Sequence, residues 1–232
     1  MRRLLVASLT VWVGLTGAVL AQSQSAVVVE LFTSQGCSSC PPADDYLAGI
    51  ADRDDVIALA LHVDYWDYIG WKDTFGSHEF TNRQHRYAQA ANARSVYTPQ
   101  FVVGGADHVV GNGPSEVAAL IRSHMAQNSG VSVSMDRSGG TVTITAETAN
   151  ALPDGAVVQL VHYLPEASVK IKRGENAGRS ISYHNIVTAI EQIGTWDGKA
   201  AYHADVKAGD GPLVVLVQSS GMGPILAAAR LR

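Results

Sequence analysis

The sequence predicts an α/β domain followed by a small all-β sandwich domain. Up to about residue 129, apolar strand-like runs alternate with helix-like segments, which is typical of a sheet that contains parallel strands. From about residue 130, short strand-like segments are separated by turn residues, which is typical of a β-sandwich. The predicted divisions are residues 1–21, a segment that precedes both domains, then 22–129 and 130–232.

Residues 1–21 have the features of a secretory signal peptide. Arg2 and Arg3 precede the apolar segment 4–20, and Val19 and Ala21 suit the two positions that a signal peptidase reads. The apolar run is short for a membrane span, although an uncleaved N-terminal anchor is the alternative. We expect cleavage near Ala21, a periplasmic or secreted mature protein, and no stable membrane insertion after cleavage.

The first domain is expected to follow the order strand, helix, strand, helix, hairpin, helix. Residues 27–32 form a strand-forming run, and Pro41 suits the first turn of a helix. Residues 56–63 are continuously apolar, as in a buried parallel strand. The remaining predicted elements are a helix over 78–92, a hairpin over 101–110 and a helix over 114–125.

The second domain is expected to contain about seven short strands. Turn residues separate these segments, and 138–140 in particular suit a hairpin turn. A charged segment over 173–179 suits a hairpin tip. The predicted strands cover residues 131–135, 141–145, 157–164, 168–172, 202–206, 213–217 and 225–230.

The charge balance argues against nucleic-acid binding. Without Arg2 and Arg3, the remaining 15 basic and 21 acidic residues give a formal net charge of −6. Such a chain has no electrostatic attraction to phosphates. The composition, 47% hydrophobic and 16% charged, suits a folded core.

The chain has only two cysteines, Cys37 and Cys40. Exported proteins usually use cysteines to link distant segments, but a bridge between these two closes a very small loop and adds little stability. The pair follows a strand and opens a helix, where free N–H groups and the helix dipole favour a thiolate. We therefore predict a redox pair, with Cys37 as nucleophile and Cys40 as resolving thiol. An inert disulfide and a metal site remain alternatives.

Two segments resemble known redox proteins. Residues 30–41 are similar to the active-site segments of glutaredoxins and thioredoxins, and Thr98-Pro99 before 101–105 resembles the thioredoxin cis-proline loop. The resemblance implies that the first domain is thioredoxin-like and that Pro99 is cis and packs beside the dithiol. Ser-Ser between the cysteines departs from thioredoxins and leaves the direction of electron flow open. The buried thioredoxin Asp has no clear counterpart, so Glu30 is the candidate proton relay.

Longer runs resemble one secreted bacterial family. Residues 30–44, 62–73, 96–100 and 173–176 are similar to the family catalogued as domain of unknown function 1223. The resemblance spans nearly the whole mature chain. It implies a thioredoxin-like domain with a C-terminal β-sandwich, and it implies no reaction.

The leading functional hypothesis is an exported thiol–disulfide oxidoreductase that acts on a protein thiol or disulfide partner and needs no dissociable cofactor. Its candidate catalytic residues are Cys37, Cys40, Thr98, Pro99 and Glu30.

There are two alternatives. One is a copper-binding chaperone that uses Cys37, Cys40 and His62, since soft thiolates favour Cu(I). The other is a non-catalytic binding module in which the thioredoxin-like unit is a scaffold.

Four aromatic residues follow the buried strand 56–63. They are Tyr65, Trp66, Tyr68 and Trp71. They either pack the long segment 64–93 onto the domain or line a groove for an apolar ligand.

Overall fold

The computed structural model describes residues 26–111 and 113–232, which form a mixed α/β fold with one large and one small sheet. The predicted signal peptide, residues 1–21, lies outside the described residues. Within the described part of the chain, no helix is long and apolar enough to cross a membrane.

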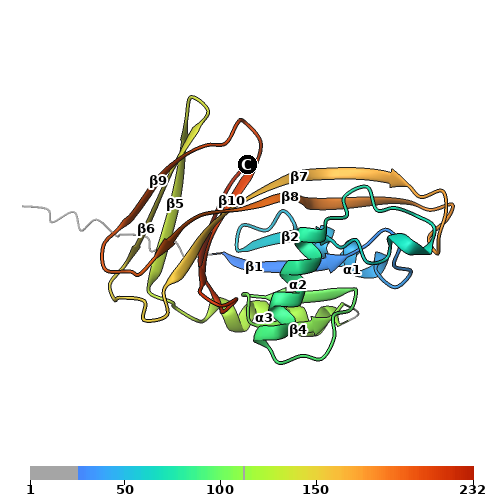
Figure 1. Ribbon diagram of the computed structural model, residues 1–232, viewed down its shortest axis with the longest axis horizontal. Helices are drawn as coiled ribbons and strands as arrows, with labels where there is room; N and C mark the ends of the chain where they lie inside the picture. Colours follow the sequence, from blue (N-terminus) through green and yellow to red (C-terminus); the bar gives the residue numbers. More distant parts are fainter. Residues whose placement is uncertain (1–25, 112) are drawn as a thin grey trace, which may run out of the picture.

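The first half of the chain contains the helices and four strands (Figure 1). In order these are β1 (Val27–Thr33), α1 (Pro41–Ile50), β2 (Val56–His62), the short 3-10 helix η1 (Asp67–Ile69), α2 (His78–Ala90), β3 (Gln100–Val103), β4 (Asp107–Val110) and α3 (Pro114–Met125). The strands, helices and hairpin predicted for this half are therefore confirmed.

The second half consists of strands. In order these are β5 (Val131–Ser138), β6 (Thr141–Thr148), β7 (Ala156–Lys170), β8 (Ser180–Trp196), β9 (Tyr202–Lys207), β10 (Leu213–Ser219) and β11 (Ile225–Leu231). The two segments expected as separate strands, 157–164 and 168–172, are one strand of 15 residues, and the 17-residue β8 was not predicted. Beyond Asn185 the pattern of β8 loses its alternation between buried and exposed positions, so this part of β8 carries no clear strand signal.

The eight-stranded sheet joins both halves of the chain. Its order is β11-β10-β7-β8-β2-β1-β3-β4, with β2 parallel to both β1 and β8. Strands β5, β6 and β9 form the second sheet, which packs on the first through a shared apolar core that includes Val142, Leu160 and Val215. One sheet thus crosses the expected boundary near residue 130, and the division into two domains stays a prediction.

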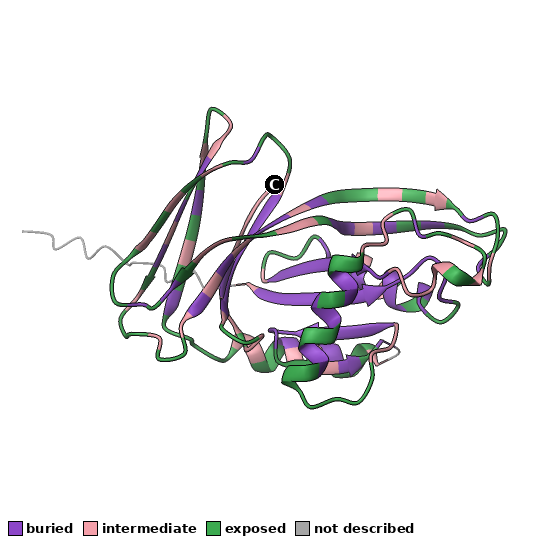
Figure 2. Ribbon diagram, viewed as in Figure 1, coloured by how far each residue is buried: buried purple, intermediate pink, exposed green. Residues whose placement is uncertain are grey.

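Strand β1 is buried on both faces because its alternate residues enter two different cores. Val28 and Phe32 pack with residues of α2, whereas Val29 and Leu31 pack with residues of α1 and α3. Figure 2 shows these central strands as the most buried part of the sheet. The end of β1, where the cysteine segment begins, is therefore held rigidly.

The hairpin β7–β8 extends along the large sheet and ends beside the segment before α1 (Figure 1). Its tip is the charged segment 173–179 that the sequence indicated as a hairpin tip. This long reach brings residues of the second half of the chain to the cysteines.

Candidate functional site

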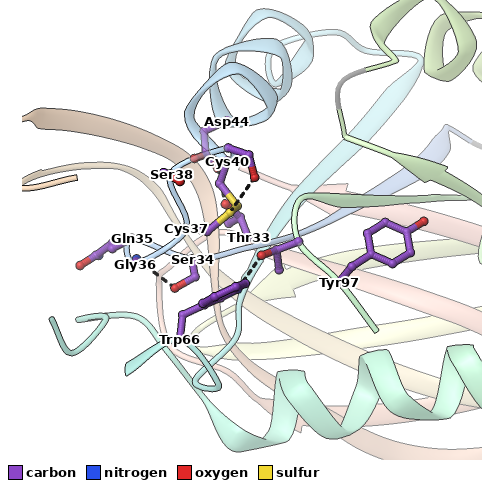
Figure 3. Close-up of a disulfide and its surroundings, with 12 residues drawn as sticks. Thr33, Ser34, Gln35, Gly36, Cys37, Ser38, Cys40, Asp44, Trp66 and Tyr97 are labelled. Atoms are coloured by element: carbon purple, nitrogen blue, oxygen red, sulfur yellow. Dashed lines mark hydrogen bonds between the residues drawn. A yellow bond between two sulfur atoms is a disulfide. The ribbon is translucent and has the colours of Figure 1, made fainter. Parts of the chain in front are cut away.

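Cys37 and Cys40 form a disulfide between the end of β1 and the start of α1 (Figure 3). Cys40 is the N-cap residue of α1, and its carbonyl accepts hydrogen bonds from the amides of Ala43 and Asp44. The cysteines are buried, with exposed fractions of 2% and 0%, whereas Ser38 and Ser39 between them are exposed. The predicted arrangement, a dithiol that opens a helix, is thus confirmed.

The loop before the disulfide is held by the segment that follows η1. The amide of Gln35 donates to Asp73 Oδ2 at 2.7 Å, and its side-chain amide donates to Thr74 Oγ1 at 2.8 Å. Trp71 Nε1 in turn donates to Gln35 Oε1 at 2.8 Å. This tryptophan of the aromatic group therefore fixes the loop that leads to Cys37.

The tip of the β7–β8 hairpin binds the same loop. The side-chain amide of Asn176 donates to the carbonyl oxygens of Gln35 at 3.0 Å and Cys37 at 2.9 Å. Asn176 is itself buried, and its Oδ1 accepts from Arg179 at 3.1 Å. The neighbouring Glu175 accepts a longer bond, 3.3 Å, from the amide of Ser38. The second half of the chain thus completes the surroundings of the dithiol.

Trp66 connects the dithiol loop with the proline loop (Figure 3). A β-carbon at Gly36 would lie 3.1 Å from the β-carbon of Trp66, so glycine permits this close packing. Trp66 Nε1 donates to Thr98 Oγ1 at 2.7 Å, and the Thr98–Pro99 bond is cis, as the resemblance implied. Tyr68 stacks on Trp66 and is 79% exposed. The aromatic group therefore contains packing residues and one exposed ring.

A buried polar cluster lies beneath the dithiol helix. Asp44 Oδ1 accepts from Thr33 Oγ1 at 2.8 Å, and His62 Nδ1 lies 2.8 Å from Asp73 Oδ2. The ring of Tyr183 packs against the ring of His62 with centroids 4.8 Å apart. Asp44 Oδ2, His62 Nε2 and the Tyr183 hydroxyl have no hydrogen-bond partner among the described residues.

Burial and charge act in opposite directions within this cluster. Burial raises the pKa of Asp44 to about 7, although the charge of His62 and the bond from Thr33 lower it. Burial also acts to raise the pKa of Asp73, but His62 and two backbone amides outweigh it and hold that pKa below its usual value. Asp44 therefore changes its protonation state near neutral pH, which Asp73 does not.

Glu30, the candidate proton relay, belongs to a different cluster. Its carboxylate accepts from Arg83 Nε at 2.6 Å and from the Tyr87 hydroxyl at 2.5 Å. Arg83 also donates to the side chains of Gln159 and Gln218. In the part of the chain that the structure describes, no hydrogen bond joins Glu30 to either cysteine.

The alternative copper ligands do not gather at one point. Within residues 26–111 and 113–232, no group of three or more His, Cys, Asp or Glu side chains is placed to hold a metal ion. Cys37 and Cys40 are bonded to each other, and His62 binds Asp73 through Nδ1. The set Cys37, Cys40 and His62 therefore gains no support from this geometry.

Three residues of the site were not predicted. Asp73 and Asn176 are distant from the cysteines in sequence; the family-like segments 62–73 and 173–176 contain them, but only tertiary contacts show what they do. Asp44 had a usable signal, since it lies four positions after Cys40 and so on the same face of α1.

A family comparison identifies relatives for most of the chain. Residues 28–218 match the family described as "Protein of unknown function (DUF1223)". The chain belongs to this family. No curated protein matches it.

Two solved structures are similar to this chain. Protein AGR_C_4864 of Agrobacterium tumefaciens is 35% identical, with a TM-score of 0.78 over 91% of this chain and 96% of that one. HBP35 of Porphyromonas gingivalis is 16% identical, with a TM-score of 0.65 over 90% of this chain and 75% of that one. The first is a relative by sequence, and the second shows similarity of fold alone.

Proposed function

We propose that this DUF1223 protein is an exported thiol–disulfide oxidoreductase built on a thioredoxin-like domain. The observation that carries the proposal is the Cys37–Cys40 disulfide at the N-terminus of α1, with the Thr98–Pro99 loop linked to it through Trp66. A bridge across so short a loop contributes little to stability. Its placement at the positive end of a helix favours the thiolate form that exchange chemistry needs.

The reaction is a two-step exchange. A partner thiolate attacks Cys37 Sγ, the Cys37–Cys40 bond breaks, and the electron pair leaves with Cys40, which takes up a proton. The second partner thiol then loses its proton and attacks the mixed disulfide, so that Cys37 leaves as a thiolate and takes up the proton that the first partner thiol released. The partner dithiol loses two electrons and two protons, and the cysteine pair gains them. The same steps in reverse reduce a partner disulfide and reform the Cys37–Cys40 bond, and no dissociable cofactor is required.

The surroundings of the two sulfurs support Cys37 as the attacked one, although both cysteines are buried. Cys37 Sγ lies 3.4 Å from the hydroxyl of Ser39, which is exposed, whereas Cys40 is fully buried. A partner sulfur therefore approaches from the side of the two serines. The backbone near Cys37 is held by Asn176, so little of it has to be ordered when a partner binds.

The test is an equilibrium titration of the metal-free mature protein. The protein is equilibrated in graded glutathione buffers, and alkylated thiols are counted by mass spectrometry. We expect a reversible transition of two thiols, at about −120 mV for an oxidant or about −270 mV for a reductant. A pair that stays in one state throughout the series contradicts the proposal.

A pair of variants tests the order of attack. Cys40→Ser is expected to accumulate a mixed disulfide with glutathione at Cys37, because no second thiol can resolve it. Cys37→Ser is the matched control and is expected to react slowly, because Cys40 is buried. Equal reactivity of the two variants would show that the assignment of Cys37 is wrong.

A further inference from the structure

The polar cluster beneath α1 is unusual because its buried polar atoms lack partners. Most buried polar groups in native proteins are hydrogen-bonded, and each exception needs a reason. Among the described residues, three of the four buried side-chain atoms without a partner belong to this one cluster: Asp44 Oδ2, His62 Nε2 and the Tyr183 hydroxyl. An unpaired carboxylate oxygen that is buried costs stability, so its retention points to a use.

Asp44 lies on the same face of α1 as Cys40, whose sulfur has to exchange a proton. Cys40 has α-helical backbone angles, and the amide of Asp44 donates to its carbonyl. Residues four apart on a helix are neighbours on one face. Figure 3 shows Asp44 beside Cys40 at the start of α1. Cys40 has no exposed surface, so solvent does not reach its sulfur directly.

We infer that Asp44 is the proton acceptor and donor for Cys40, and that His62 and Asp73 are positioning residues that set its protonation. This inference rests on the proposed thiol–disulfide exchange and names a residue of its mechanism. Asp73 fixes the His62 ring through Nδ1, and Nε2 stays buried without a hydrogen-bond partner among the described residues. Thr33 fixes one oxygen of Asp44 and leaves the other free.

The proton step balances in both directions. When a partner thiolate attacks Cys37, the leaving Cys40 thiolate takes the proton of the Asp44 carboxylic acid, which becomes a carboxylate. When the protein is oxidised through a mixed disulfide on Cys37, the carboxylate takes the proton of the Cys40 thiol. The resulting thiolate attacks Cys37 Sγ and expels the partner thiolate.

Three other titratable groups act on Asp44, and Asp44 in turn acts on a fourth, Tyr183. His62 on β2 lowers its pKa, whereas Asp73 and the exposed Asp45 raise it. The ring of Tyr183 on β8 packs against that of His62, and its own pKa is raised by burial and then by Asp44 and Asp73. These groups leave Asp44 with a pKa of about 7, where a carboxyl group can both accept and donate a proton.

The test separates the attack by Cys37 from the attack by Cys40. Reduced protein is mixed with dithiobis(nitrobenzoate), and thionitrobenzoate release is followed by stopped flow. The first equivalent reports attack by Cys37, and the second reports attack by Cys40 on the mixed disulfide. Asp44→Asn is compared with Asp45→Asn, which removes an exposed carboxylate from the adjacent position of the same helix.

We expect Asp44→Asn to slow the second release at neutral pH about 100-fold and to leave the first unchanged, because a lost general base typically costs that much. The wild-type rate of the second release should rise with pH and level off near pH 7, the pKa of Asp44. The Asp44→Asn rate should keep rising, and Asp45→Asn should behave as wild type.

Two results would contradict a proton-transfer role for Asp44. If Asp44 acted only through its negative charge, its removal would favour the Cys40 thiolate and speed the second release. An unchanged or faster second release in Asp44→Asn therefore overturns the inference while the proposed function stands. The wild-type profile is a second, independent measurement, and a profile without a plateau near pH 7 also overturns it. A wild-type pair that cannot be cycled between its states in glutathione buffers rejects both proposals.

Discussion

Two buried charged clusters lie near β1, and they differ in how completely their atoms are paired. Around Glu30, both carboxylate oxygens have partners, and Arg83 contacts three further side chains. Around Asp44, three polar atoms have no partner among the described residues. A fully paired cluster is what a structural role requires, whereas unpaired atoms beside a dithiol suit proton transfer. Both clusters are buried and charged, so the difference between a structural role for Glu30 and the proposed proton transfer by Asp44 lies in how many of their polar atoms are hydrogen-bonded.

The largest expected change in stability comes from a substitution that breaks the paired cluster around Glu30. Arg83→Met removes the cation and leaves the Glu30 carboxylate buried without its ion-pair partner. We expect a loss of about 3–5 kcal/mol in the free energy of unfolding, as for other buried ion pairs that lose one member. Urea denaturation at neutral pH, followed by circular dichroism, measures it.

A double variant shows whether the charge is the cause. Glu30→Leu combined with Arg83→Met removes both members of the pair, and we expect it to be more stable than Arg83→Met alone. A double variant that is less stable than either single variant would indicate that packing, and not the unpaired charge, dominates at this cluster.

The next largest effect is a gain in stability, and it comes from a substitution in the unpaired cluster around Asp44. The pKa of Asp44 is about 7 in the folded state against an ordinary value of 3.8. The folded state therefore holds this proton more tightly, and the fold loses stability as pH rises from about 4 to 7. Asp44→Asn removes this loss, and its unfolding free energy should exceed that of wild type at pH 8 by up to about 4 kcal/mol.

The difference between Asp44→Asn and wild type should shrink progressively toward pH 4, as measured by urea denaturation across the pH range. Asp45→Asn is the control, since this neighbouring carboxylate is exposed and its removal should give no such trend. A gain in stability that is independent of pH would mean that the Asp44 carboxyl is not titrating in this range.

Local signals in the sequence predicted most of the first half of the fold and the dithiol itself. Cys37 and Cys40 were recognised from their spacing between a strand and a helix, and the hairpin over 101–110 from its turn. Strand β8 was missed because much of it lacks a clean alternation of buried and exposed residues. Its strand conformation depends on pairing with β7, which no local pattern records.

The site was predicted only where its residues are near each other in sequence. Asn176 contacts the Cys37 carbonyl across 139 positions, so its role depends on the hairpin that carries it. The sequence favours Glu30 as the proton relay because it is the nearest acid before the two cysteines. The sequence does not show that Arg83, 53 positions away, pairs with it. Which acid stays unpaired is a tertiary property.

A smaller effect tests the link between the two halves of the chain. Asn176→Asp keeps the size of the side chain but removes the N–H groups that bind the carbonyls of Gln35 and Cys37. Buried acceptors that lose their donor cost about 1–3 kcal/mol, and we expect a loss of that size in the unfolding free energy. Amide hydrogen exchange should also become faster at residues 35–38.

Glu175→Gln is the matched control at the next position, because its bond to the Ser38 amide is exposed and long. We expect it to change stability by less than about 0.5 kcal/mol. If Asn176→Asp had an equally small effect, the hairpin tip would rest beside the dithiol loop without holding it.

The smallest effect concerns the contact between Trp66 and the proline loop. Trp66→Phe keeps an aromatic ring beside Gly36 but removes the bond from Nε1 to Thr98 Oγ1. Because both groups are only partly buried, we expect a loss of about 1 kcal/mol, the usual net value of one hydrogen bond. A double-mutant cycle with Thr98→Val measures the coupling by urea denaturation. Additive losses would mean that the two loops are positioned independently, so that Trp66 contributes to the site by packing alone.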